Sequence, residues 1–142
     1  MAKQKKEVQV MKILDFGVFP GKLMFSHGFS YDEIMDQLIE QKCDGWAEAI
    51  SKDKELFDNS QYTASYRIVE KKGEHFHFYF IILQKQFQFT DYDYCVLAHE
   101  VLHICQFFLP DILDRNREIE AEAYLHTHLM KQCLSAIRGN EV

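Results

Sequence analysis

Several common sequence patterns are missing from this chain of 142 residues. Its four cysteines form no C-x-x-C pair, so we expect free, mostly buried thiols in a cytoplasmic protein. No apolar run approaches the roughly 18 residues that a membrane span requires. The basic start, residues 1–6, lacks the apolar stretch of a signal peptide, so we expect residues 1–7 to be a frayed terminus.

Positive charge is also scarce. The chain has 16 Lys and Arg against 22 Asp and Glu, a formal net charge of −6, which argues against a general nucleic-acid surface. No internal repeat or low-complexity segment is visible. The length suggests a single domain over residues 1–142, and a hydrophobic content of 47% is enough for a sizeable core.

The most informative stretch is His99-Glu100-Val101-Leu102-His103, an H-E-x-x-H sequence. Residues four apart lie on one face of a helix, so the two imidazoles can bind one Zn²⁺ ion through their nitrogens. Glu100 can then reach a water bound to that ion. The motif therefore predicts a metal-assisted hydrolysis with Glu100 as its general base.

The surroundings of the motif indicate a helix. Thr90 can cap its N-terminus, Asp91 and Asp93 complement the dipole in its first turn, and Pro110 stops it. Apolar residues cover it nearly all round, which predicts a buried helix. The alternative to a metal site is a pair of core histidines held by hydrogen bonds, with Glu100 on a solvated strip.

A catalytic zinc needs a third protein ligand, and the next segment offers candidates. Asp114 can cap a second helix over about residues 115–137, with Gly139 just past its end. The short linker before it predicts that the two helices are neighbours. At about 100° per residue the apolar face centres near Ala123, Met130 and Leu134. Three glutamates are then candidates: Glu120 and Glu122 on opposite shoulders of this face, and the more solvated Glu118.

Glu120, Ala123 and Tyr124 form the pattern E-x-x-A-Y after H-E-x-x-H. Over about residues 92–130 the chain therefore resembles the gluzincin class of zinc peptidases. It also resembles small metallopeptidase-like proteins of phages and prophages and, more distantly, the ImmA/IrrE-type peptidases and minigluzincins. The resemblance implies that Glu120 is the third ligand. Tyr124 stands where these families usually have an acidic or amide residue, and one turn after Glu120 it can hydrogen-bond a ligand histidine.

The remaining chain predicts strands and shorter helices. Ser30 with Glu33 is a capping-box signature, and a Gly-containing turn at residues 71–74 joins two strands into a hairpin. We expect a turn at residues 19–21, strands over 8–16, 22–25, 62–70 and 75–83, helices over 31–41 and 45–56, and a possible strand extension at 87–89. The result is an α+β fold: a small zincin-like domain whose short antiparallel or mixed sheet packs on the active-site helix, followed by the third-ligand helix.

The favoured function is a zinc-dependent peptidase acting on a peptide or protein substrate, with His99, His103 and Glu120 as ligands. Two alternatives stay open. One is a binding or regulatory module that retains the metal site without turnover. The other is a structural zinc site, closed by His128 or Glu122 as a fourth ligand. His75 and His77 share one face of a strand, but this spacing more often marks a solvated or hydrogen-bonded pair.

Overall fold

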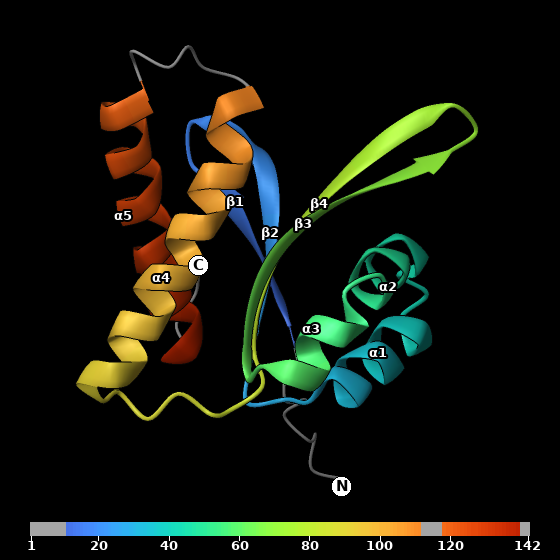
Figure 1. Ribbon diagram of the computed structural model, residues 1–142, viewed down its shortest axis with the longest axis horizontal. Helices are drawn as coiled ribbons and strands as arrows, with labels where there is room; N and C mark the ends of the chain where they lie inside the picture. The colour runs from blue at the N-terminus through green and yellow to red at the C-terminus, as the bar shows by residue number, and fades with distance from the viewer. Residues whose placement is uncertain (1–10, 112–117, 140–142) are drawn as a thin grey trace, which may run out of the picture.

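The computed structural model describes residues 11–111 and 118–139. Four strands form one mixed sheet between two layers of helices (Figure 1). The strands are β1 (Lys12–Phe16), β2 (Phe19–His27), β3 (Tyr62–Lys71) and β4 (Glu74–Leu83). The helices are α1 (Tyr31–Glu40), α2 (Asp44–Ser51), α3 (Lys54–Asn59), α4 (Asp91–Phe108) and α5 (Glu118–Ile137), with a 3-10 helix, η1 (Leu109–Asp111), after α4. The expected α+β class and mixed sheet are confirmed.

The strand order in the sheet is β1-β2-β4-β3. Antiparallel pairs, β1 with β2 and β3 with β4, stand at the two sides, and β2 and β4 run parallel between them. β4 pairs with β2 only through Tyr79–Leu83, so the outer half of the β3–β4 hairpin projects beyond the sheet (Figure 1). Among the described strands, β3 therefore forms one edge of the sheet.

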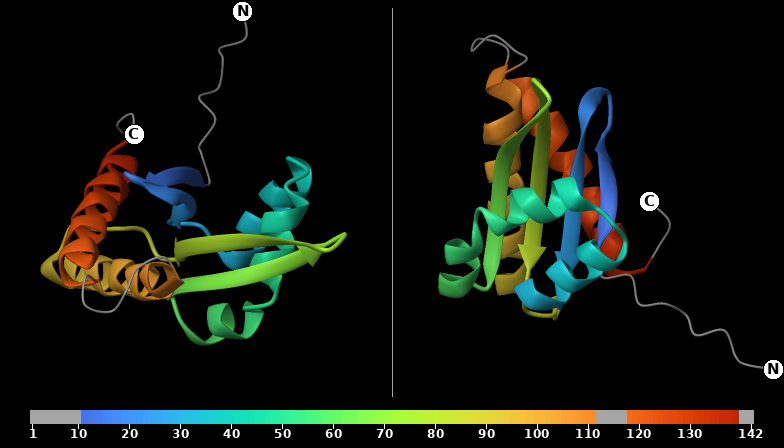
Figure 2. Two further views of the ribbon diagram at one scale, coloured as in Figure 1. Left: turned by 90° about the horizontal axis from the view of Figure 1, so that it is seen from above. Right: turned by 90° about the vertical axis from the view of Figure 1, so that its right-hand side faces the viewer.

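Each face of the sheet carries its own hydrophobic core. α1, α2 and α3 cover one face, and α4 and α5 cover the other, with α4 along β3 and α5 along β1 (Figure 2). The side chains buried on the α1–α3 side are Met24, Ile34, Leu38, Ile50, Phe57, Phe80 and Ile82. The larger core on the α4–α5 side includes Phe16, Phe25, Ile81, Leu97, Val101 and Leu129. The larger core holds α4 against β3.

Local signals in the sequence set several element ends. Ser30 and Glu33 form the predicted capping box at the start of α1. Thr90 Oγ1 accepts a hydrogen bond from the backbone N–H of Asp93 and so caps α4. The hairpin turn has positive φ at both central residues, Lys72 and Gly73, as a two-residue type I′ turn requires. These predictions are confirmed.

The predicted turn at residues 19–21 is wrong. The turn lies at Gly17 and Val18, and β2 already begins at Phe19. Gly17 has a φ of +71°, and its N–H donates to the side chain of Asp15, a combination that closes a tight turn. The register of β1 and β2 shifts between Asp15 and Phe16, so Pro20 falls in a bulge, where the absence of its N–H costs no ladder bond.

The helix predicted over residues 45–56 is two helices, α2 and α3. The chain breaks at Asp53, whose side chain is buried beneath the sheet. Its carboxylate accepts a hydrogen bond of 2.6 Å from the hydroxyl of Ser65 and forms an ion pair with the guanidinium of Arg67. Contacts with Ser65 and Arg67, which are distant from Asp53 in the sequence, thus end α2. Helical periodicity cannot reveal such contacts.

Removing the Arg67 guanidinium should destabilise the fold. Arg67→Met leaves the Asp53 carboxylate buried without its charged partner, and we expect a loss of about 2 kcal/mol in the free energy of unfolding. Urea denaturation measures the change. Lys54→Met is the matched control, because Lys54 pairs with Asp58 in solvent, where an ion pair contributes under about 0.5 kcal/mol. Equal losses in the two variants would contradict the structural role of Asp53.

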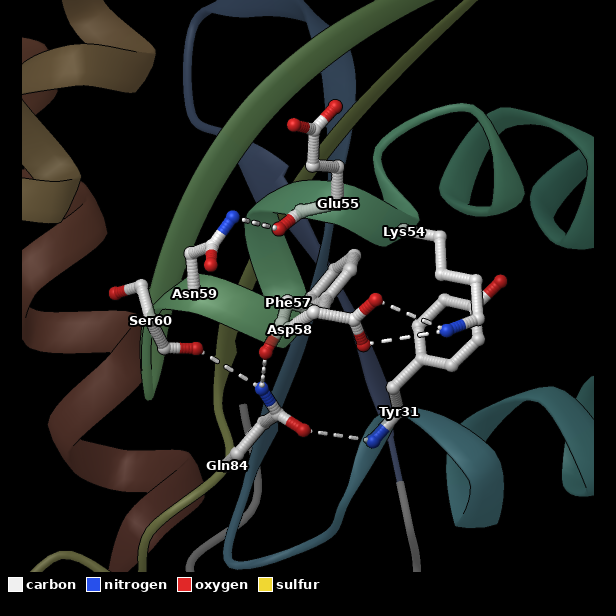
Figure 3. A network of polar contacts seen from close by, with 8 residues as sticks. All are labelled: Tyr31, Lys54, Glu55, Phe57, Asp58, Asn59, Ser60 and Gln84. Carbon is white, nitrogen blue, oxygen red and sulfur yellow. Dashed lines mark hydrogen bonds and ion pairs between the residues drawn. The ribbon is translucent and has the colours of Figure 1, made fainter.

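Gln84 ties the two ends of the α1–α3 layer together (Figure 3). Its side-chain amide donates to the carbonyls of Phe57 and Ser60, each at 3.0 Å. Its side-chain oxygen accepts from the N–H of Tyr31 at 2.9 Å. This network holds Ser60, which lies two residues before β3, in place.

His27, the last residue of β2, provides a test of pH dependence. Within the described residues its buried Nδ1 has no hydrogen-bond partner, and burial lowers the pKa of the ring from its ordinary value of 6.5. The unfolded chain therefore binds a proton more readily than the folded one, so stability should fall as the pH drops below 6.5. Urea denaturation at about pH 7.5 and about pH 5.5, on either side of the ordinary histidine pKa, measures this loss.

The His27→Leu variant should lose this part of the pH dependence. His75→Leu, which removes an exposed histidine from the hairpin, should keep it. An unchanged pH dependence in His27→Leu would show that the ring is not the group responsible.

α5 presents a different face from the one predicted. Ala123 is exposed, and the fully buried side chains are Leu125, Leu129 and Cys133. The reason is that α5 packs against both α4 and β1, so two neighbours set its buried stripe. The helix ends at Ile137 and Gly139 follows with a φ of +78°, as expected.

The remaining predictions are either wrong or concern residues outside the described part of the chain. The proposed cap at Asp114, the predicted helix start at 115 and the frayed residues 1–7 lie outside the described part of the chain. Residues 87–89 form a loop, not a continuation of β4. No helix within residues 11–111 and 118–139 is long and apolar enough to cross a membrane.

Candidate metal centre

The two histidines of the H-E-x-x-H motif converge on the surface of α4. Their Nε2 atoms are 3.0 Å apart, and the rings stand nearly perpendicular, with centroids 4.5 Å apart. His99 is exposed and His103 half-buried, so the predicted burial of α4 on all sides is wrong along this strip. The strip also carries Cys95, one turn before His99.

This geometry fits two ligands of one metal ion. Tetrahedral zinc with Zn–N bonds of about 2.05 Å holds two nitrogens about 3.3 Å apart, close to the separation seen here. The same contact can also be a hydrogen bond between two neutral imidazoles, which is the alternative that the sequence left open. Because both nitrogens point to one place, little rearrangement is required for a metal to take the position of that hydrogen bond.

Glu100 lies next to the pair, between α4 and the sheet. It is half-buried, and its carboxylate lies near the backbone N–H of Ala64 in β3. Burial raises the pKa of Glu100 above its ordinary value, and the neighbouring His99 and His103 and the backbone N–H of Ala64 oppose the shift. A carboxylate with a raised pKa is a stronger base near neutral pH.

The structure does not bring Glu120 to the histidine pair. Glu120 is exposed, and it lines an open hollow of about 470 Å³ on α5 together with Tyr124, His128 and Lys131. Within the described ranges no three His, Cys, Asp or Glu side chains are close enough together to hold a metal ion. The described residues therefore supply two converging ligands, and the third remains a prediction.

Glu122 faces α4 more directly than Glu120 does. Burial, with a smaller contribution from the negative charge of Glu122, raises the pKa of the Cys105 thiol in α4 to about 12. Glu122 is half-buried, and it lies one turn before the buried Leu125. The packing of α5 thus separates two glutamates that helical periodicity had placed symmetrically.

Tyr124 lies on the same side of α5 as Glu120. Its ring stacks on His128 and packs edge-on against Phe19. A Cβ atom at Gly17 would come within 2.5 Å of its hydroxyl, so Gly17 leaves room for this side chain. The predicted hydrogen bond from Tyr124 to a ligand histidine is not among its described contacts.

Four of the other histidines have polar partners of their own. His126 Nε2 donates to the carbonyl of Ala98 in α4 at 3.0 Å, and His128 Nε2 lies 3.0 Å from the carboxylate of Asp15. His75 lies 3.5 Å from Glu70, and His77 hydrogen-bonds the hydroxyl of Tyr66. The pair His75 and His77 thus matches the interpretation as exposed, hydrogen-bonded residues.

An open hollow beside the histidine pair escaped the sequence analysis. Residues of α4, of the start of β3 and of the end of α3 line it: Ser60, Tyr62, Tyr92, Cys95 and Val96, together with His99 and Glu100. The positions of Cys95 and Val96, one turn before the motif, could have indicated the α4 wall. Nothing local could have indicated Tyr62, which is brought there by the pairing of β3 with β4.

Comparisons of the chain with protein-family models, curated proteins and solved structures found no match. The residues of this site and their geometry are therefore the basis for a proposed function.

Proposed function

We propose that the chain is a zinc-dependent hydrolase that cleaves peptide bonds. The observation that carries the proposal is the 3.0 Å separation of the Nε2 atoms of His99 and His103, with the Glu100 carboxylate beside them. Two imidazoles and a carboxylate in the order H-E-x-x-H are the donor set and base of a metalloprotease.

Each of the three residues has a separate role in this proposal. His99 and His103 hold the ion, and Glu100 takes a proton from the attacking water and passes it to the leaving amine. A bound zinc ion lowers the pKa of a coordinated water to about 7 and polarises the scissile carbonyl. The backbone N–H of Ala64 lies near the Glu100 carboxylate and favours its charged form.

Glu120 is the third ligand in the proposal, on the strength of the E-x-x-A-Y pattern. Its position on the outer side of α5 means that it has to approach the histidine pair when metal binds. Glu122, which lies nearer to α4, is the alternative.

Metal analysis tests the proposal. Protein purified without added metal should contain about one zinc per chain, and His99→Ala and His103→Ala should contain none, because a site of this type has three protein ligands. His75→Ala is the control, since it removes an exposed imidazole from the hairpin. A parent protein that takes up no metal even when zinc is supplied would contradict the proposal.

One observation favours a second function, a peptide-binding module that does not catalyse turnover. It is the exposed position of Glu120, away from the histidine pair. Such a protein would bind peptides but would cleave none after zinc is added. Cleavage that requires zinc and Glu100 would rule it out.

A further inference from the structure

The side of α5 that faces away from the core is hollowed. α5 lies at the side of the molecule farthest from the β3–β4 hairpin (Figure 1), and it packs on α4 and β1 through the buried Leu125, Leu129 and Cys133. At about 100° per residue, the residues that line the hollow of about 470 Å³ lie on the opposite side of the helix. These residues form the outer face of α5: Glu120, Ala123, Tyr124, Thr127, His128 and Lys131.

Tyr124 is an exposed projection on the outer face of α5. Its side chain is 42% exposed, although its ring stacks on His128. His128 is fixed in turn, because its Nε2 lies 3.0 Å from the carboxylate of Asp15. Next to Tyr124 the face is low, since Ala123 and Thr127 are exposed residues with small side chains. The face thus combines a preorganised aromatic ring with a depression that can accept one.

The charged side chains of the outer face lie at its two ends and have opposite signs. Glu120 and Lys131 are both exposed, and they are separated by about three turns, or about 16 Å along the helix axis. Within the described residues neither of them forms an ion pair. A second copy of α5 lying antiparallel on this face places opposite charges together at both ends, whereas a parallel copy places like charges together.

The same antiparallel alignment also matches large side chains with small ones. When Glu120 lies opposite Lys131 of the second copy, Tyr124 lies opposite Thr127, and Ala123 lies opposite His128. Two-fold symmetry repeats each of these contacts, so the face is complementary to itself. Two helices can then approach to the usual distance of about 8–10 Å, because each projecting ring faces a low part of the other helix.

We propose that the outer face of α5 is the interface of a homodimer, in which α5 of each copy packs antiparallel on α5 of the other. The Tyr124 rings fill the depressions over Thr127, and ion pairs between Glu120 and Lys131 set the register. The contact spans about three turns of one helix, less than the roughly 800 Å² per partner of a standard interface, so the dimer dissociates reversibly. This inference does not rest on the proposed function.

Sedimentation equilibrium of the full chain tests the proposal. The chain is measured from about 1 µM to about 1 mM, a range that covers the dissociation constants of small reversible interfaces. A chelator is present, because the proposed function uses Glu120 as a metal ligand. We expect the average mass to rise with concentration from that of one chain toward that of two. A mass that stays at one chain throughout would overturn the proposal.

Charge reversals identify the face and the register. Glu120→Lys and Lys131→Glu each replace two attractive pairs by two repulsive ones, so each should raise the Kd of the dimer by about tenfold. The double variant exchanges the two charges and should recover the parent Kd. Glu40→Lys, at the exposed end of α1, is the control for the change in net charge and should have no effect. Single variants with the parent Kd would overturn the interface, and a double variant no tighter than the single ones would overturn the antiparallel register.

Truncation of the ring tests the fit of the two faces. Tyr124→Ala removes two rings from each dimer, so Kd should rise by at least about tenfold, whereas Tyr124→Phe should retain the parent value. Phe76→Ala is the matched control, because it removes an aromatic side chain of similar exposure, 44% against 42%, from the hairpin. An equal rise in Phe76→Ala, or none in Tyr124→Ala, would overturn the assignment to the outer face of α5.

Discussion

Glu100→Gln should abolish peptide hydrolysis while the protein retains its zinc. The amide keeps the shape of the carboxylate, but it cannot take a proton from water. General base catalysis contributes about 10²- to 10⁴-fold, so we expect the turnover rate to fall by about 10³-fold. Turnover of a peptide substrate and zinc content are measured on the same preparation.

The control for this variant is Glu40→Gln, an exposed carboxylate at the end of α1 on the opposite side of the sheet. It should change neither quantity. Full activity in Glu100→Gln would remove Glu100 from the reaction, and loss of zinc in it would mean that the side chain binds the metal instead of the proton.

The second large effect concerns the third ligand. The E-x-x-A-Y pattern predicts that Glu120→Ala loses the zinc and that Glu122→Ala keeps it. Removing a direct ligand should weaken zinc affinity by more than about 100-fold, the upper end of what loss of a ligand's hydrogen-bond partner costs. Competition with a chromophoric chelator measures the affinity of both variants, and Glu55→Ala, an exposed glutamate of α3, is the control.

The reverse result would be equally informative. Loss of zinc in Glu122→Ala alone would mean that the face of α5 packed toward α4 identifies the ligand, and that the likeness to E-x-x-A-Y is accidental. Retention of zinc in both variants would contradict a glutamate of this pair as the third ligand.

The sequence predicted features that depend on neighbours a few residues away. The capping box at Ser30, the cap at Thr90 and the hairpin turn at Gly73 are all local, because each satisfies backbone groups within one turn. The convergence of His99 and His103 belongs to the same class, since spacing on one helix determines it.

Features that depend on distant partners were missed. The break between α2 and α3 requires Ser65 and Arg67 to reach Asp53 from the sheet. The buried face of α5 depends on β1 as well as on α4. The hollow beside the motif needs Tyr62, which only the pairing of β3 with β4 places there. In each case the feature depends on tertiary contacts between residues that are distant in the sequence.

The two hydrogen bonds of Ser60 also bear on solubility. A sheet's outermost strand with unsatisfied backbone groups is a template on which another chain can add, and native proteins protect such strands against aggregation. Here the Ser60 hydroxyl donates to the carbonyl of Tyr62 and accepts from its N–H, so both backbone groups at the start of β3 are satisfied within the chain. Replacing Ser60 with alanine would leave these two groups available to a second chain, whereas threonine would keep the hydroxyl.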